Sequence, residues 1–323
     1  MENRVYGVLG IVSRMSNWNA DFTGYPKTTS SGDVFGSDKA FKYPIKKMWE
    51  QQGEKVLYIK SMKLQEVKEK KEKKAEIELI PRSLKERYEQ IFEEKDLKEN
   101  KDDKKVLNNL FSAIDVKNFG ATFAEGGNNI SITGAVQIGQ GFNKYSDTDP
   151  EVQQILSPFR DATKKKKKDN EEDDDAKSST LGTKIVSDEA HYFYPFTINP
   201  QAYDGFKELE VTEGYTEKDY KKFKEASMVA ATSFATNAKI GCENEFAMFV
   251  ETDRDLYLPD LSQYIVFEKC DDKGKITIKC TALFNDLKER IKSIEIYYNP
   301  YTTTIEKDIE NAKYFNIFTK EEV

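Results

Sequence analysis

Histidine, cysteine and long apolar runs are all scarce in this chain of 323 residues, and each shortage excludes a class of protein. His191 is the only histidine, so one chain cannot build a metal site with two histidine ligands. Cys242, Cys270 and Cys280 are odd in number and have no CxxC spacing, which argues against a disulfide framework and a thiolate zinc site. No run approaches the roughly 18 apolar residues of a membrane helix, and residues 5–12 lack the features of a signal peptide. We therefore expect a cytoplasmic protein with no membrane, metal or cofactor partner.

The composition is that of a folded protein with an acidic surface. Hydrophobic residues make up 38% of the chain and include 20 Phe and 17 Tyr, enough for a substantial core, so full disorder is excluded. The formal net charge is −7, from 50 Lys plus Arg and 57 Asp plus Glu. Such a balance does not exclude nucleic-acid binding, because repulsion is screened beyond about 8–10 Å while local basic clusters make the contacts. We interpret His191, which lies among tyrosines, as structural rather than catalytic.

The first half of the chain alternates strand and helix patterns. Residues 4–13 predict a buried strand, and residues 14–36 form a long polar loop. Pro44 suits a first helical turn and Gly53 the residue after a helix end, so we expect a helix between them. Phe41 would extend this helix one turn back, with a kink at Pro44. The further expectations are solvated, charged helices over 67–78 and 84–100, β structure over 106–143, and a hairpin of 121–124 with 130–138.

The second half begins with opposed charge blocks. Five lysines at 164–168 are followed by six acids within 169–175, a pattern typical of solvated, mobile segments. A capping box from Thr216 to Asp219 predicts a helix that ends near 237–241. We further expect strands at 191–200, 245–251, 264–270 and 275–280, a short helix at 286–293 and a final strand at 294–299. The order of elements predicts an α+β fold with an antiparallel, ferredoxin-like (RRM-like) sheet and long insertions.

Two features of the first half could bind a nucleic acid. The polar segment Asn17–Asp21 precedes a helix on which Lys39, Lys42 and Lys46 fall at positions i, i+3 and i+7, with Lys47 beside them. A stripe of cations with Asn and Ser donors nearby suits backbone phosphates. An ordinary solvated lysine face explains the stripe equally well. In both interpretations we expect the lysines to be exposed and to contribute little to stability.

Glycines interrupt two β-like segments, 115–124 and 132–141. Gly120, Gly134, Gly139 and Gly141 indicate either bulges or the close approach of another backbone, and simple bends of a twisted sheet are the favoured interpretation. Neither segment contains a GxGxxG or P-loop motif, so nucleotide hydrolysis has no support.

Together these segments resemble a known family. The chain is similar to the backbone subunit of type I CRISPR Cascade complexes, in the RAMP superfamily and most like the type I-B branch. The motifs, in chain order, are NWNAD, SDKAFKYPIKKMW, DVKNFGATFA, ITGAVQ and LGTKIVSDEAHYFYPFTINP. The resemblance implies a palm (1–53, 106–141 and 191–323), inserted helical fingers (54–105) and a β-hairpin thumb (142–190) with a mobile charged tip (163–178). Tyr43-Pro44 and Ala135 depart from the usual family pattern, which carries a basic residue with a good helix former, and a proline.

The resemblance also implies a function without catalysis. Copies of the chain would polymerise along a CRISPR guide RNA (crRNA) and present it for base pairing with target DNA in antiviral defence. The other partners would be the guide 5′-end-binding subunit and the large and small subunits of the complex. The implied RNA-binding residues are Asn17, Asn19, Lys39, Lys42, Lys46, Lys47, Asn118, Phe119, Gly120, Thr133, Gln137 and Lys184.

Two alternatives remain open. In related type III complexes the backbone subunit is a metal-dependent endoribonuclease with an aspartate before the first helix, a place that Asp38 or Asp33 could fill here. The other alternative is a general single-stranded RNA-binding protein outside CRISPR systems.

Overall fold

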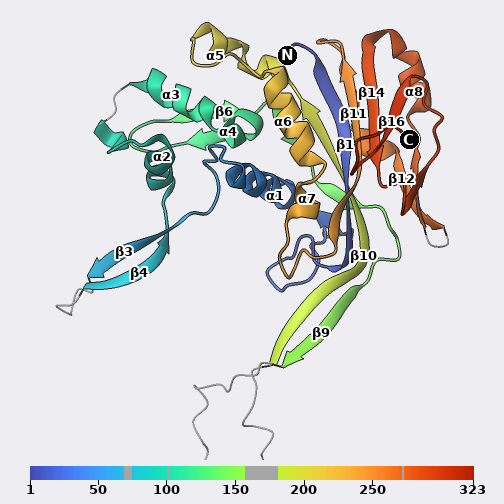
Figure 1. The fold of residues 1–323 in the computed structure, drawn as a ribbon, viewed down its shortest axis with the longest axis horizontal. Coiled ribbons are helices and arrows are strands. Elements are labelled where there is room, and N and C mark those ends of the chain that lie inside the picture. Colours follow the sequence, from blue (N-terminus) through green and yellow to red (C-terminus); the bar gives the residue numbers. More distant parts are fainter. Residues whose placement is uncertain (69–74, 100–101, 157–180, 271–272) are drawn as a thin grey trace, which may run out of the picture.

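The computed structural model describes residues 1–68, 75–99, 102–156, 181–270 and 273–323, and within these ranges the fold is α+β, as the sequence predicts. A large mixed sheet forms its centre, in the order β16-β14-β11-β1-β10-β8-β2, with β7 and β9 also paired to β10 (Figure 1). All its pairs are antiparallel except β14 with β16. The strands are β1 (Arg4–Ser16), β2 (Phe35–Gly36), β7 (Val136–Ile138), β8 (Gly141–Asn143), β9 (Pro150–Leu156), β10 (Leu181–Ile198), β11 (Cys242–Thr252), β14 (Ile291–Tyr298) and β16 (Ala312–Asn316).

Strand β1 is buried on both faces because it lies in the middle of this sheet. Val5 and Leu9 point into one hydrophobic core, while Tyr6 and Val8 point into the other, as the period of two requires. A strand that is covered on both faces has a nearly continuous apolar sequence, and this segment has that pattern.

Helices cover one face of the sheet and a small second sheet covers the other. The helical side carries α1 (Asp38–Gln51), α4 (Ile114–Phe119), α6 (Glu217–Ser227) and α7 (Ala230–Ser233). The opposite side carries β12 (Ile265–Cys270), β13 (Lys273–Ile278), β15 (Thr303–Ile305) and α8 (Thr281–Asp286). Short helical turns complete the chain: Pro200–Tyr203, α5 (Asp204–Glu208), Leu261–Tyr264 and Lys288–Arg290.

A further lobe follows α1. It contains a hairpin of β3 (Met62–Lys68) and β4 (Ala75–Pro81), the helices α2 (Leu84–Phe92) and α3 (Asp103–Ser112), a turn at Leu97–Glu99, and a hairpin of β5 (Gly120–Phe123) and β6 (Ile130–Thr133). Tyr88, Leu97, Val106, Leu110 and Phe123 are fully buried and join the lobe to the main core.

Two expectations for this lobe are wrong. Of the segment 67–78, the described residues 67–68 and 75–78 belong to a β-hairpin rather than a helix, because Ile77 and Leu79 alternate with glutamates at the period of a strand. Residues 106–119 are helical rather than β-like: Val106 and Leu110 are one helical turn apart and both face the core. The expected hairpin of 121–124 with 130–138 is right in its first part, but Val136–Ile138 pairs with β10 instead.

Two hairpins extend from the same side of the body, as Figure 1 shows. One is β3–β4. The other is β9 with the outer part of β10, called the arm from here on (residues 150–156 and 181–187). Because β10 has 18 residues, the strand that forms the arm continues into the centre of the sheet. The expected mobile tip at 163–178 lies outside the described residues.

Several element boundaries also differ from expectation. Helix α1 begins at Asp38 and contains Pro44, because the Ser37 side chain accepts the N–H of Ala40 and caps the helix earlier. The capping box of Thr216 and Asp219 is confirmed, but α6 ends at Ser227, where the chain leaves the helical conformation before α7. The short helix lies at Thr281–Asp286 rather than 286–293, and β14 is not the last strand. Within the described ranges, no helix is long and apolar enough to cross a membrane.

Candidate nucleic-acid interface

Helix α1 lies between the two projecting hairpins in the view of Figure 1, and its sequence carries four lysines. Phe41, Pro44, Ile45 and Trp49 are buried against the body and fix the rotation of the helix. The opposite side carries a set that spans about 140° of the helix circumference at 3.6 residues per turn. This set, called the α1 face from here on, consists of Lys39, Lys42, Tyr43, Lys46 and Lys47.

One edge of the α1 face converges on the ring of Phe119 from α4. The ammonium of Lys42 lies 5.2 Å and that of Lys46 5.8 Å from the ring centroid. The Phe119 ring is itself held by stacking on Trp49, with centroids 5.7 Å apart. The structure thus brings together two of the predicted lysines and one predicted aromatic residue. Lys42 also forms an ion pair of 2.9 Å with Asp38.

Lys46 faces a buried carboxylate. Asp115 is 1% exposed, accepts the backbone N–H groups of Leu57 and Tyr58 at 2.8 Å each, and lies 3.7 Å from the Lys46 ammonium. Burial lowers the pKa of Lys46, and the charge of Asp115 offsets this only in part. The side chains of Lys42 and Lys46 are only 15% and 16% exposed, so the expectation of exposed lysines is wrong at both positions.

The other two lysines are more open. Lys39 is exposed and forms no ion pair with any residue that the structure describes. Lys47 is half-buried and pairs with Glu50 at 2.8 Å, a spacing of i, i+3 on the same helix. Judged by the described part of the chain, Lys39 in the first turn is thus the one lysine of the α1 face without an ion-pair partner, and the other three are paired.

The contacts of α4 and the residues that follow it fix the position of Phe119 beside the α1 face. Asn118 is fully buried; its amide donates to the carbonyl of Ile114 and accepts the hydroxyl of Tyr215, both at 2.8 Å. Its side chain therefore faces the interior and positions α4. Gly120 has φ +81°, and a Cβ there would lie 2.5 Å from the nitrogen of Gly134. The glycines at 120 and 134 therefore allow a close approach of two backbone segments, rather than the simple bend of a twisted sheet that was the favoured interpretation.

Thr133 and Gln137 are exposed at the junction of β6 and β7. Thr133 lies opposite Gly120 in the β5–β6 ladder, and the Gln137 amide donates to the carbonyl of Gly134 at 2.8 Å. The Tyr203 hydroxyl donates to the carbonyl of Lys117 and accepts the N–H of Ala135. These bonds hold the two glycine segments against each other, which sets the position of Phe119.

The loop after β1 connects the arm with α1. Asn17 is 6% exposed, and its amide donates to the carbonyls of Gly24 at 2.9 Å and of Ile185 in the arm at 3.2 Å. The side-chain oxygen of Asn19 accepts the N–H of Ser37, the residue that caps α1, at 2.7 Å. Lys184, next to Ile185, is half-buried on the arm and is thus near this loop rather than the α1 face.

Sequence reasoning missed Lys239. Its ammonium donates to the carbonyl of Asn17 at 2.6 Å and to that of Trp18, and lies 5.3 Å from the Trp18 ring. Burial lowers its pKa. The bond to Asn17 joins residues 222 positions apart, so no local pattern could have revealed it.

The aspartates of the alternative catalytic interpretation have local partners. Asp38 pairs with Lys42, and Asp33 accepts the hydroxyls of Ser31 at 2.7 Å and Thr29 at 3.3 Å. Among the described residues, no three His, Cys, Asp or Glu side chains gather in an arrangement that could hold a metal ion.

His191 lies at the base of the arm in a buried ionic cluster, as expected for a structural histidine. Its Nδ1 is 2.8 Å from the carboxylate of Glu245 in β11, its Nε2 is 3.3 Å from that of Glu189, and its ring stacks on Phe267. Burial would lower the pKa of His191, but the two carboxylates outweigh it and raise the pKa above 6.5.

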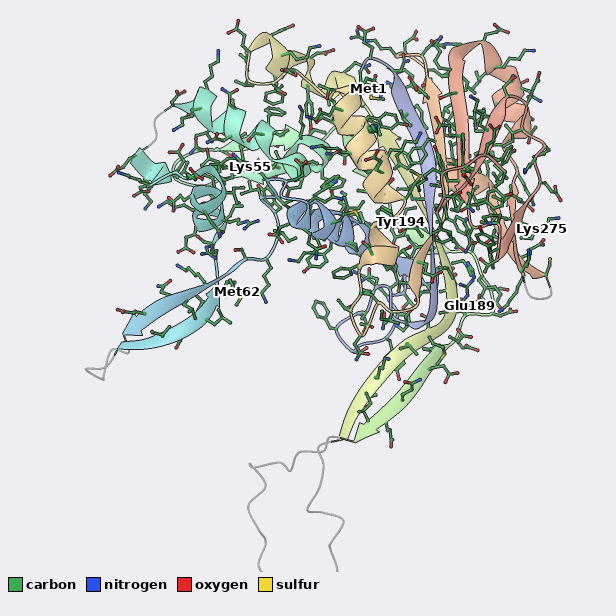
Figure 2. All side chains as sticks on the ribbon, viewed as in Figure 1. Met1, Lys55, Met62, Glu189, Tyr194 and Lys275 are labelled. Carbon is green, nitrogen blue, oxygen red and sulfur yellow. The ribbon has the colours of Figure 1, made fainter. Side chains whose placement is uncertain are left out.

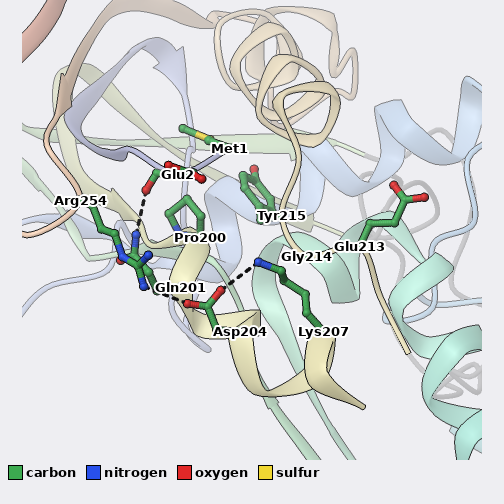
Figure 3. A pocket seen from close by; sticks show the side chains of 10 residues that line it. All are labelled: Met1, Glu2, Pro200, Gln201, Asp204, Lys207, Glu213, Gly214, Tyr215 and Arg254. Carbon is green, nitrogen blue, oxygen red and sulfur yellow. Dashed lines mark hydrogen bonds and ion pairs between the residues drawn. The ribbon is translucent and has the colours of Figure 1, made fainter. Parts of the chain in front are cut away.

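A separate polar pocket of about 170 Å³ lies near the N-terminus (Figure 3). Gln201 donates to the backbone of Glu2, and Asp204 pairs with both Lys207 and Arg254. The pocket carries charges of both signs, and its lining residues are not those of the α1 face. Figure 2 shows the side chains of the whole molecule around both regions.

The elements above define an α+β protein with a central mixed sheet, an inserted lobe and two projecting hairpins. The chain belongs to the family described as CRISPR-associated protein Cas7, whose model matches residues 3–297. Two chains from solved structures share the fold. One, from a "CRISPR RNA-guided surveillance complex, pre-nicking", is 14% identical, has a TM-score of 0.53 and is matched over 97% of both chains. Another, from a "CRISPR RNA-guided surveillance complex", is 12% identical, has a TM-score of 0.52 and is matched over 96% of this chain and 94% of the other. A comparison with curated proteins gives no match.

Proposed function

We propose that this protein is the crRNA-binding backbone subunit of a type I CRISPR RNA-guided surveillance complex, most like the type I-B branch. Membership of the Cas7 family and the fold shared with two surveillance-complex chains support the assignment to such a complex. The choice of branch rests on the sequence motifs alone. The other partners would be target DNA, through base pairing, further copies of the chain, and the remaining subunits of the complex.

The observation that carries the RNA-binding proposal is the α1 face. It places four lysines on one side of a helix: Lys39 is exposed and the other three are partly buried, and two of those three share the ring of Phe119. Cations on one face with an aromatic ring at its edge suit a single strand, whose phosphates bind the cations while its bases contact rings. Thr133 and Gln137 add exposed polar groups on the adjacent β6–β7 junction.

The domain roles follow from the same proposal. Residues 1–53, 106–141 and 191–323 form the palm, 54–105 the fingers and 142–190 the thumb. In a row of copies, the arm of one would cover RNA bound by the next. The projection of the arm away from the body supports this role (Figure 1).

The proposed role is non-catalytic. The carboxylate of Asp38, the candidate for metal-dependent cleavage, is engaged by Lys42 of the α1 face at 2.9 Å, so this pair serves the basic surface. Incubation of the assembled protein with complementary RNA and Mg²⁺ tests the point. Regularly spaced cuts that are lost in Asp38→Ala would show cleavage and contradict the proposal.

The decisive test is the nucleic acid that the protein carries. When the protein is produced together with a CRISPR array and its partner subunits, we expect it to purify with RNA of uniform length. RNA of mixed length and sequence would instead indicate a general single-stranded RNA-binding protein. Protein without RNA, and without affinity for a short single-stranded RNA at low salt, would overturn the proposal.

A further inference from the structure

Tyr43 is an aromatic side chain in the middle of the α1 face. It is 41% exposed, whereas Phe41 and Trp49, the aromatic residues on the buried side of the same helix, are 3% and 1% exposed. Lys39 and Lys47 precede and follow it by four residues each, so the ring lies between two lysines along one side of the helix. At 1.5 Å per residue these lysines are about 12 Å apart along the axis.

The ring of Tyr43 is held in place from one side. It packs nearly perpendicular to Phe234, which follows α7, with centroids 5.5 Å apart and an interplanar angle of 77°. Aromatic pairs of this geometry are favourable beyond the area they bury. The contact therefore fixes the ring orientation while the side chain stays open to solvent. Pro44, the next residue, is buried and holds this part of α1 against the body.

A fixed, exposed aromatic ring between two cations matches the chemistry of a single nucleotide segment. A nucleobase stacks on the ring, and the phosphates on either side reach the lysines. The lysine that precedes the ring, Lys39, has no ion-pair partner among the described residues and is free to bind a phosphate.

We propose that Tyr43 is a base-stacking residue, which holds one unpaired nucleobase of the bound RNA while Lys39 and Lys47 contact the flanking phosphates. The inference rests on the proposed RNA-binding function and adds to it a residue that recognises the base rather than the backbone. Stacking is tolerant of sequence, because every base has an aromatic face.

The test measures binding of a short fluorescein-labelled single-stranded RNA at several salt concentrations. Stacking is worth about 1–3 kcal/mol per base, so Tyr43→Leu should weaken binding by about 5- to 150-fold. The slope of log affinity against log salt should not change, because no charge is lost. Tyr43→Trp should restore affinity. Lys39→Ala should instead flatten the slope by about 0.7.

Tyr257→Leu is the matched control. Tyr257 is 71% exposed and its ring lies against Arg4, outside the α1 face, so this variant should bind RNA with unchanged affinity.

A second measurement detects stacking directly. The wild-type protein should quench the fluorescence of an RNA that carries 2-aminopurine, Tyr43→Phe should quench it equally, and Tyr43→Leu should quench it less. If Tyr43→Leu showed the affinity and the quenching of the wild-type protein while Lys39→Ala still flattened the salt slope, the base-stacking proposal would be overturned. The proposed RNA binding would remain supported. If Tyr43→Leu bound RNA as the wild-type protein does but assembled fewer copies, Tyr43 would be a contact between subunits, and the base-stacking proposal would be overturned as well. No binding of RNA by the wild-type protein would contradict the proposed function itself.

Discussion

His191 lies in an ionic cluster that joins four strands, β1, β10, β11 and β12. The imidazole lies between the carboxylates of Glu245 and Glu189, and Glu189 in turn pairs with Arg14 and Lys269. Hydrogen bonds to His191, together with those to the two cations, lower the pKa of Glu189. The cluster thereby ties the base of the arm to β1, β11 and β12 by alternating charges.

The raised pKa of His191 predicts a pH-dependent stability. The folded state keeps the imidazole proton at pH values where the unfolded state, with a pKa near 6.5, has lost it. The stabilisation is therefore complete below about pH 6.5 and is lost as pH rises through the folded pKa. We expect the free energy of unfolding to fall over this range in the wild-type protein and not in His191→Gln. Urea titrations at several pH values measure it, and a difference between the two proteins that does not vary with pH would contradict it.

The sole histidine makes the same pKa directly observable. One imidazole signal should titrate in the proton–nitrogen NMR spectrum, with a midpoint above 6.5 that falls in Glu245→Gln. A midpoint at or below 6.5 in the wild-type protein would show that burial outweighs the two carboxylates.

Two lysines of the α1 face should respond differently to truncation. Lys46→Ala removes the cation nearest to the buried carboxylate of Asp115, and we expect a loss of about 1–3 kcal/mol in the free energy of unfolding. Lys39→Ala should change stability by no more than about 0.5 kcal/mol. Chemical unfolding of both variants decides the point. Equal stabilities would mean that the two backbone N–H groups satisfy Asp115 without help from Lys46.

At the level of elements, the α4–β5 and β6–β7 junctions depend on two glycines in contact. A Cβ at Gly134 would lie 2.2 Å from the backbone carbon of Phe119, a distance that only a backbone shift could relieve. Gly134→Ala should therefore lower the free energy of unfolding by about 1–3 kcal/mol. It should also weaken RNA binding, because Phe119 would move away from Lys42 and Lys46.

Gly205→Ala is the matched control for this prediction. Gly205 lies in α5, and a Cβ added there would have no atom within 4 Å, while alanine favours a helix by up to about 1 kcal/mol over glycine. Thermal unfolding should show a lower midpoint for Gly134→Ala and an equal or higher one for Gly205→Ala. Equal midpoints for the two variants would mean that the junction relaxes without cost.

Local signals predicted the elements that local chemistry controls. The capping box at Thr216 and the buried strand that contains Val5 and Leu9 could be read directly. The β3–β4 hairpin could not, because the dense charges of 67–78 masked the alternation of Ile77 and Leu79. The start of α1 was open between two alternatives, because Pro44 suits a first turn while Phe41 and the lysine spacing extend the helix further back; the missing N–H of Pro44 is tolerated inside this helix.

The site was predictable only where its residues share one element. Spacing along α1 placed Lys42 and Lys46 on one face, as the structure shows. Spacing could not show that Asp115 would lie beside Lys46, nor that Asn118 would be buried, because both depend on how α4 packs. Lys239 belongs to the same class of contacts between distant parts of the chain.

At the scale of the whole molecule, the arm should be dispensable for folding but needed for assembly. Val152 and Ile185 are paired across the arm, so an Asn-Gly turn in place of residues 153–184 closes the hairpin with a two-residue loop. The replacement keeps the bond from Asn17 to the carbonyl of Ile185. We expect this variant to fold with a wild-type circular dichroism spectrum and to bind short RNA, but not to form ordered rows of subunits on long RNA.

The measurement is the mass distribution of protein bound to a long single-stranded RNA, compared with the wild-type protein at equal occupancy. Regular assemblies of full length from the shortened variant would contradict the proposed thumb role. An unfolded variant would show that the arm also supports the sheet. Asn17→Ala, which keeps the arm but loses the side-chain bonds to Ile185 and Gly24, would then test that role separately.

The position of β1 in the sheet has a consequence for the chain as a single polypeptide. Its two hydrogen-bonded neighbours, β10 and β11, both lie after residue 180, whereas β1 itself comes at the start of the chain. A chain divided between residues 156 and 181 would thus yield two fragments, each lacking the strand partners that the other holds. Neither fragment alone can complete the core around Leu9, yet together they contain every pairing of the central sheet. The protein is therefore suited to split-protein complementation. The two fragments would have to associate before the proposed assembly on RNA could begin.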